Sequence, residues 1–174
     1  MSFKHLDSLF KPQSIAVIGA SNASNRPGFA VMRNLLQGHF NGPIMPVTPD
    51  YKSVQGVLAY RSIDELPLVP DLAIICTRAS RVPAIIMQLG RKGTRCAIVI
   101  ASGLESLYTA QGTNLQQQMQ QIAAHWNIRL LGPNSLGFMA PALGLNASYA
   151  HTPAQPGKIA FLSQSSAMCV ALLD

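Results

Sequence analysis

Residues 14–22 read SIAVIGASN, and this segment is the strongest indication of fold class in the chain. Its first six residues end at Gly19 and form a continuous, largely apolar run, which is typical of a strand buried on both faces of a parallel sheet. A polar loop then leads to Gly28 and into a segment whose apolar residues recur with helical period. A strand, a glycine turn and a helix in this order predict the first unit of a doubly wound α/β fold.

Further apolar segments lie at 43–48, 71–77 and 94–101, with a shorter one at 128–131. Stretches of helical period separate them, and the longest runs from 108 to 126 through a glutamine-rich tract that we interpret as a solvated helix face. The alternation predicts an α/β fold with a Rossmann-like doubly wound parallel sheet. Three glycines are expected to end helices: Gly38, Gly90 and Gly93.

The character of the chain changes at Gly132. Proline and glycine punctuation over 133–157 predicts a linker with short strands. The segment KIAFLS, 158–163, then restarts the pattern of a buried strand, and a helical segment follows it. We therefore expect a Rossmann-like domain over 1–132 and the truncated start of a second, flavodoxin-like α/β domain over 158–174, which is too short to bury a core of its own.

Composition argues against several classes of partner. The net charge of +6 reflects a shortage of acids, since 13 Lys and Arg stand against 7 Asp and Glu. The basic residues form no run and aromatic residues are only 6%, so an anionic small molecule is a better explanation than nucleic acid. No apolar run approaches the roughly 20 residues that span a bilayer. The N-terminal segment has no signal-peptide core, so we expect a cytoplasmic protein with no membrane partner.

The reactive residue types are scattered. Cys76, Cys96 and Cys169 lie far apart in apolar stretches, as buried thiols of a reducing compartment do. The four histidines have no cysteine or carboxylate at ligand spacing, which argues against a metal site. The acids are dispersed and no nucleophile with a base partner is recognisable, so no catalytic residue is expected in this part of the protein.

The turn after the first strand is a candidate phosphate site. Backbone N–H groups of such a turn and the positive end of the following helix dipole point toward an anion. The segment from Ala20 to Asn25 contains no glycine, so the G-x-G-x-x-G pattern of dinucleotide-binding folds is incomplete. An ordinary strand-to-helix turn remains the alternative.

The end of the second strand bears on the type of nucleotide. Folds that bind NAD place an acid here for the ribose hydroxyls, but Thr48 and Pro49 occupy this place and Asp50 comes later. Lys52 offers a cation for a phosphate such as the 3′-phosphate of CoA, with a solvated surface lysine as the alternative. The next two strands end in small and hydroxyl residues, which leave room for a ligand in the crevice of an open sheet.

An ordered set of motifs resembles a known family. GASN, VTP followed by Lys52, ASGLE, LLGPNSLG and GKIAFLSQSSA resemble the CoA-binding half of NDP-forming acyl-CoA synthetases, and the layout is similar to the α subunit of succinyl-CoA synthetase. The stretches NLLQGHFNGPIMPVTP and LLGPNSLGFMAPALGLNAS most resemble bacterial protein lysine acetyltransferases, in which a synthetase-like region is fused to a Gcn5-type domain.

The resemblance implies coenzyme A or acetyl-CoA as the cofactor. It also implies, as partners, an acyl-CoA, the remaining synthetase-like and acetyltransferase domains of the parent chain, and lysines of target proteins. By residue, it places the phosphates at Gly19, Ala20, Ser21 and Asn22, the adenosine end at Pro49 and Lys52, the crevice at Cys76 and Thr77, the pantetheine arm at Ala101, Ser102 and Gly103, and the thiol end near Asn134.

Four functions follow from these observations. The first is the CoA-binding domain of a protein lysine acetyltransferase, in which the parent chain is the enzyme and this segment is non-catalytic. The second is the CoA-binding part of an active NDP-forming acyl-CoA synthetase, an acid–thiol ligase. The third is an NAD(P)-binding module, and the fourth is a docking or regulatory domain without a ligand.

Overall fold

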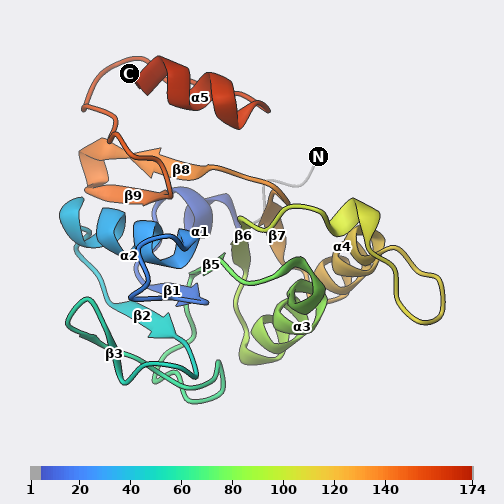
Figure 1. The fold of residues 1–174 in the computed structure, drawn as a ribbon. Coiled ribbons are helices and arrows are strands. Elements are labelled where there is room, and N and C mark those ends of the chain that lie inside the picture. Colours follow the sequence, from blue (N-terminus) through green and yellow to red (C-terminus); the bar gives the residue numbers. More distant parts are fainter. Residues whose placement is uncertain (1–4, 174) are drawn as a thin grey trace.

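The computed structural model describes residues 5–173 and contains the predicted parallel sheet (Figure 1). The five central strands are β1 (Ile15–Ile18), β2 (Ile44–Val47), β5 (Leu72–Ile75), β6 (Cys96–Val99) and β7 (Arg129–Leu131). Their order in the sheet is β2-β1-β5-β6-β7, and every neighbouring pair is parallel. This is the doubly wound arrangement, so the predicted Rossmann-like sheet is confirmed.

Helices cover both faces of the sheet. On one face lie α1 (Leu6–Phe10) and α2 (Pro27–Gln37), and on the other lie α3 (Val82–Lys92) and α4 (Leu115–His125) (Figure 1). The remaining elements are three short 3-10 helices, two small hairpins and a last helix: η1 (Ala79–Arg81), η2 (Leu104–Ser106), η3 (Pro141–Leu143), β3 (Ser53–Val54), β4 (Val57–Leu58), β8 (Gly137–Ala140), β9 (Leu145–Ser148) and α5 (Ser166–Leu173).

The strands carry apolar residues on both faces because both faces are covered. In β1, Ile15 and Val17 belong to the core beneath α2, whereas Ala16 and Ile18 belong to the core beneath α3 and α4. Ala16 is in register with Ala73 of β5, which is in register with Ala97 of β6. This row of three fully buried alanines crosses the centre of the sheet on the α3 side.

The helices differ from the sequence-based prediction at Gly90 and at the start of α4. Gly93 ends α3 in the left-handed conformation, with φ 104°, but Gly90 lies inside the helix. A Cβ at Gly90 would lie 2.3 Å from Cγ of Trp126, so this glycine serves close packing of α3 against the end of α4. α4 is shorter than the predicted 108–126 because the side chain of Asn114 accepts hydrogen bonds from the N–H groups of Gln116 and Gln117 and caps the helix there.

The predicted linker contributes to the core. β8 and β9 form an antiparallel hairpin that packs on α2, and all four residues of β9 are buried. Asn34 of α2 is 5% exposed, and its side-chain amide donates to the carbonyls of Ser148 and Ala150. The short strands predicted for 133–157 are present as β8 and β9, and the hydrogen bonds of Asn34 hold this part of the chain on α2. The assignment of 133–157 as a linker between two domains stays a prediction.

The last segment has no strand at 158–163, although a strand was expected there. Ile159 is 95% and Leu162 97% exposed, so no neighbouring strand covers their apolar side chains. α5 has no buried residue and lies beyond the β8–β9 hairpin (Figure 1). The assignment of 158–174 to a second domain stays a prediction, and Asp174 is outside the described residues.

Within residues 5–173, none of the helices is long and apolar enough to cross a membrane. The same part of the chain holds no group of three or more His, Cys, Asp or Glu side chains arranged for a metal ion.

Candidate functional site

The candidate site lies at the carboxyl edge of the sheet, where β1 and β5 are neighbours. From β1 the chain passes to α2 on one face, and from β5 it passes to α3 on the other face. The turns that leave these two strands go to opposite faces, and a ligand crevice is expected between them at such a switch point of a doubly wound sheet. The first turn begins at Gly19 and the second at Cys76.

The first turn packs closely against its surroundings. Gly19 has φ +87°, which favours glycine, and a Cβ there would lie 2.9 Å from Cγ2 of Thr77. A Cβ at Gly28, in the first turn of α2, would lie 2.1 Å from the carbonyl oxygen of Gly19. The two glycines thus allow the turn, the end of β5 and the start of α2 to meet without intervening side chains. This geometry brings backbone close to any ligand held in the crevice.

Ser21 and Asn22 have different tasks in this turn. Ser21 is 4% exposed, and its Oγ accepts a hydrogen bond from the N–H of Ala23 at 3.0 Å. The side chain of Asn22 points to the hairpin β3–β4 instead: Nδ2 donates to the carbonyl of Ser53 at 3.0 Å, and Oδ1 accepts from the N–H of Gln55 at 3.0 Å. Asn22 therefore links the turn to the hairpin, and both polar groups of its side chain are hydrogen-bonded to the hairpin backbone.

The hairpin that Asn22 holds carries Lys52 at its base. Its two central residues, Gln55 and Gly56, have φ values of 50° and 86°, as in the type I′ turns that favour tight hairpins. Nε2 of Gln55 donates to the carbonyl of Phe29 in α2, which is a second tie to the same region. Lys52 and Pro49 are exposed. The hydrogen bonds of Asn22 place the segment with Lys52 beside the turn after β1.

A pocket of about 330 Å³ opens at the ends of β5 and β6. Five predicted contact residues line it together: Cys76, Thr77, Ala101, Ser102 and Asn134. Seven other predicted residues do not line it. Six of them follow β1 or β2: Gly19, Ala20, Ser21, Asn22, Pro49 and Lys52. The seventh, Gly103, directly precedes η2. The predicted set thus divides into a group at the pocket and a group on the nucleotide side.

Five lining residues were not among the predicted contacts: Pro27, Arg78, Ala79, Ile100 and Tyr149. Pro27 is the first residue of α2 and Ile100 follows β6 directly, so both could have been found from their position next to predicted strand and helix ends. Tyr149 follows β9 and reaches the pocket only because the β8–β9 hairpin folds back on α2. The available signal was Asn34, a polar residue within the apolar stripe of α2.

The pocket is mostly neutral inside. Burial raises the pKa of the Cys76 thiol from its usual 9.0 to about 12, so this thiol is protonated at neutral pH and is no nucleophile. In the described part of the chain two hydroxyl oxygens are buried without a hydrogen-bond partner, those of Thr77 and Thr94, and of the two only Thr77 lines the pocket. A buried hydroxyl in this state costs free energy unless a ligand or water pairs with it. The loop at Asn134 is held by its N–H, which donates to the carbonyl of Ala101.

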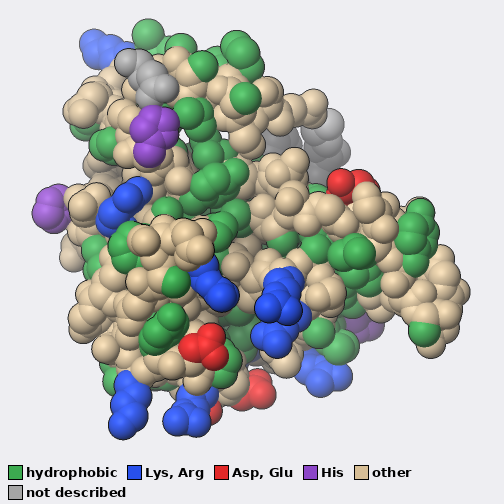
Figure 2. Space-filling model, in the orientation of Figure 1, with side chains coloured by type: hydrophobic (Ala, Val, Ile, Leu, Met, Phe, Trp, Pro, Cys, Tyr) green, Lys and Arg blue, Asp and Glu red, His purple; other side chains and the backbone are tan. Residues whose placement is uncertain are grey.

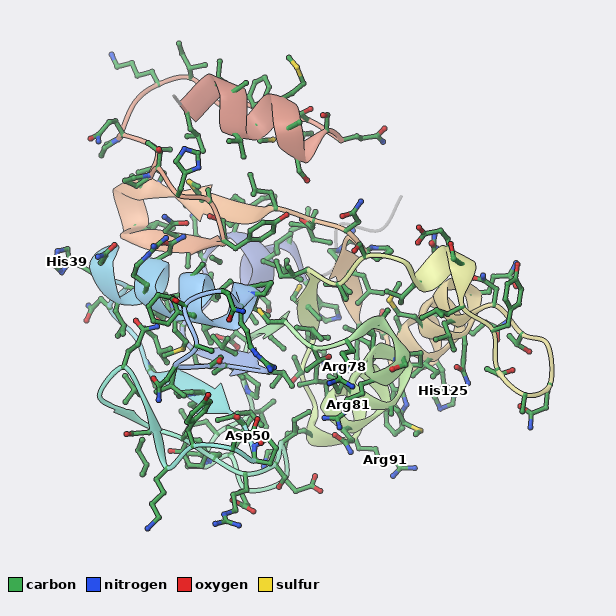
Figure 3. The ribbon with its side chains drawn as sticks, viewed as in Figure 1. His39, Asp50, Arg78, Arg81, Arg91 and His125 are labelled. Atoms are coloured by element: carbon green, nitrogen blue, oxygen red, sulfur yellow. The ribbon has the colours of Figure 1, made fainter. Side chains whose placement is uncertain are left out.

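Cations lie at the rim. Arg78 lines the pocket, and Figure 3 shows Arg78 and Arg81 close together on the turn that leads into α3. Figure 2 shows Lys and Arg side chains in the middle of the same face. The arrangement suits a ligand with an anionic end outside the pocket and a neutral end inside it.

The chain is similar in sequence and fold to known proteins. The family described as CoA binding domain matches residues 13–141. The chain is 35% identical over 169 residues to the ADP-forming acetate–CoA ligase I of Archaeoglobus fulgidus, which aligns with 97% of the chain and 24% of the relative. It is also 35% identical, over 172 residues, to the α subunit of ADP-forming acetate–CoA ligase I of Pyrococcus furiosus, covering 97% of the chain and 37% of the relative.

A solved structure has the same architecture. Acetyl-coenzyme A synthetase 1 of Ca. Korarchaeum cryptofilum, in complex with phosphate and ADP, superposes with a TM-score of 0.89 at 32% identity and covers 97% of this chain and 36% of that one. The chain thus spans about a quarter to somewhat over a third of the length of these relatives.

Proposed function

Because the chain belongs to the family of CoA-binding domains, we propose that it is the CoA-binding part of an ADP-forming acyl-CoA synthetase, an acid–thiol ligase. The observation that carries this proposal is the pocket at the ends of β5 and β6, where five residues predicted to contact CoA line one space. Coenzyme A has an anionic nucleotide end and a neutral pantetheine arm, which correspond to the basic rim and the neutral interior.

Each part of the site has a task in this proposal. The turn at Gly19 offers backbone N–H groups and the start of α2 to the pyrophosphate. Lys52 pairs with the 3′-phosphate, since a lysine ammonium is a common phosphate ligand. The arm enters the pocket, where the unpaired hydroxyl of Thr77 is available to an amide of pantetheine and Asn134 lies toward the thiol end.

The relatives favour a ligase over a lysine acetyltransferase. The three proteins named above are ligases or synthetases of acetate and CoA, and none is an acetyltransferase. The expectation of a Gcn5-type domain and of protein lysine substrates therefore has no support, whereas the alternative of an acyl-CoA synthetase does. An NAD(P)-binding module is disfavoured by Thr48 and Pro49 in the place of the ribose-binding acid, and a docking domain without a ligand is disfavoured by the open pocket.

Calorimetry on the full-length protein tests the proposal. CoA and acetyl-CoA are expected to bind at micromolar concentrations, 3′-dephospho-CoA about tenfold more weakly, and NADH not at all. Failure of a folded protein to bind any of the CoA species would overturn the assignment. Release of ADP and phosphate from ATP when acetate and CoA are supplied supports the ligase, and transfer of acetyl from acetyl-CoA to protein lysines without ATP contradicts it.

A further inference from the structure

One wall of the pocket comes from a part of the chain that the CoA-binding motifs do not include. Tyr149 follows β9 and lines the pocket together with the residues from the ends of β5 and β6. Its side chain is half-buried and packs against the core beneath α2. A large aromatic ring in such a place offers a flat apolar surface to a ligand.

The backbone on both sides of Tyr149 is fixed by one buried side chain. Nδ2 of Asn34 donates to the carbonyl of Ser148 at 2.9 Å and to the carbonyl of Ala150 at 2.8 Å. These two carbonyls flank Tyr149 in the chain. The N–H of Tyr149 itself donates to the carbonyl of Leu136 at 3.2 Å, so the residue has little freedom to move.

Further buried hydrogen bonds hold the same stretch of backbone. Oγ of Ser148 donates to Oδ1 of Asn146 at 2.7 Å and accepts from the N–H of Ala150 at 3.2 Å, and all three residues are buried. Satisfied polar networks in a core hold one geometry, because breaking any member leaves its partner unpaired. A network of this kind directly under a pocket wall holds that wall in one position.

We propose that Tyr149 contacts the ligand in this pocket by packing its ring against the pantetheine arm, and that Asn34 is the positioning residue that holds Tyr149 there. This inference rests on the proposed binding of CoA. The neutral interior is the reason for choosing the arm: Ile100, Pro27 and the ring supply apolar surface, and Thr77 supplies a hydroxyl for an amide. The phosphates instead have the turn at Gly19 on the other side of the crevice.

Two ligands separate the arm from the nucleotide. Dissociation constants for CoA and for adenosine 3′,5′-bisphosphate, which lacks the arm, are measured with the full-length protein and with Tyr149→Ala and Tyr149→Phe. Tyr149→Ala is expected to weaken CoA about tenfold and the bisphosphate less than about twofold, because only the arm meets the ring. Tyr149→Phe keeps the ring and is expected to stay within about twofold for both ligands.

Asn34→Ala tests the positioning role and is expected to reproduce the selective loss of CoA affinity. Asn41→Ala, at an exposed asparagine in the loop after α2, is the matched control and should change neither constant. If Asn34→Ala does not fold, the two Tyr149 variants decide alone. Equal weakening of both ligands by Tyr149→Ala, or none, would overturn the inference while CoA binding stands. A wild-type protein that binds neither ligand would instead overturn the proposed function.

Discussion

The side-chain amide of Asn22 donates a hydrogen bond to the carbonyl oxygen of Ser53, 31 residues later in the chain, at 3.0 Å. This bond and the return bond from the N–H of Gln55 join the turn after β1 to the hairpin that carries Lys52. In the proposed complex, Asn22 sets the distance between the pyrophosphate at the turn and the 3′-phosphate at Lys52, together with the hydrogen bond from Nε2 of Gln55 to the carbonyl of Phe29.

Replacing Asn22 with alanine is expected to reduce the preference for CoA over 3′-dephospho-CoA. The two lost hydrogen bonds contribute about 1 kcal/mol each to holding the hairpin, so Lys52 moves more freely while the pocket stays intact. Titration calorimetry with both ligands measures the ratio. Asn25→Ala, in the same exposed loop, is the control, and an unchanged ratio in Asn22→Ala would show that the hairpin holds its place without these hydrogen bonds.

Reversing the charge at Lys52 is expected to act on one phosphate only. Lys52→Glu should weaken CoA by about tenfold or more, because an ion pair is replaced by repulsion, and should leave 3′-dephospho-CoA nearly unchanged. Competition binding with the two ligands checks this. Lys158→Glu changes the net charge equally at another exposed lysine, and a similar loss in that variant would mean that the effect comes from the general field of the protein.

A methyl group at Gly28 is expected to destabilise the fold. Its Cβ would lie 2.1 Å from the carbonyl oxygen of Gly19, which is backbone and cannot rotate away. Overpacking of this kind costs about 1–3 kcal/mol, so urea denaturation should show a lower midpoint for Gly28→Ala. Gly157→Ala is the matched change, since nothing lies within 4 Å of its Cβ position, and equal stability of the two variants would contradict the close approach.

The Cys76 thiol is expected to resist alkylation at neutral pH. Its pKa is raised to about 12 by burial, so the reactive thiolate is nearly absent at pH 8. Cys76 and Cys169 are both partly exposed, so iodoacetamide labelling followed by peptide mass spectrometry should modify Cys169 before Cys76 because of the raised pKa of the Cys76 thiol. Rapid labelling of Cys76 in the native protein would contradict the raised pKa of this thiol.

The same raised pKa makes the free energy of unfolding depend on pH. Because the pKa of Cys76 in the folded protein lies above the usual 9.0, the stabilising effect of the neutral thiol is complete below pH 9 and is lost as the pH rises toward 12.

The strands could be predicted because their residues contain their own signal. The segments 72–76 and 96–101 are apolar throughout, and only a sheet covered on both faces buries such segments in a parallel order. Helix ends were less certain. The apolar stripe through 108–126 does not show that Asn114 caps the helix from within, and no pattern distinguishes a capping glycine from Gly90, whose place depends on Trp126 from another helix.

The site was predictable where strand ends provide it. Cys76, Thr77, Ala101 and Ser102 follow strands whose order in the sheet brings their ends together, so their meeting in one pocket follows from topology. Tyr149 was not predictable in this way, because its position depends on hydrogen bonds from Asn34 across more than 110 positions of sequence. Likewise, the sequence made Asn22 a candidate phosphate ligand, and only the structure shows that its side-chain amide is hydrogen-bonded to the backbone of Ser53 and Gln55.

The alanines at 16, 73 and 97, in register across the sheet, leave its centre thin beneath α3. α3 starts shortly after the turn of Cys76 and Thr77, and the small side chains of this row let the helix lie close to the sheet. A larger side chain at one of these three positions would push α3 away from the sheet and widen the pocket next to its first turn. The width of the proposed CoA site thus depends on buried residues that do not line the pocket.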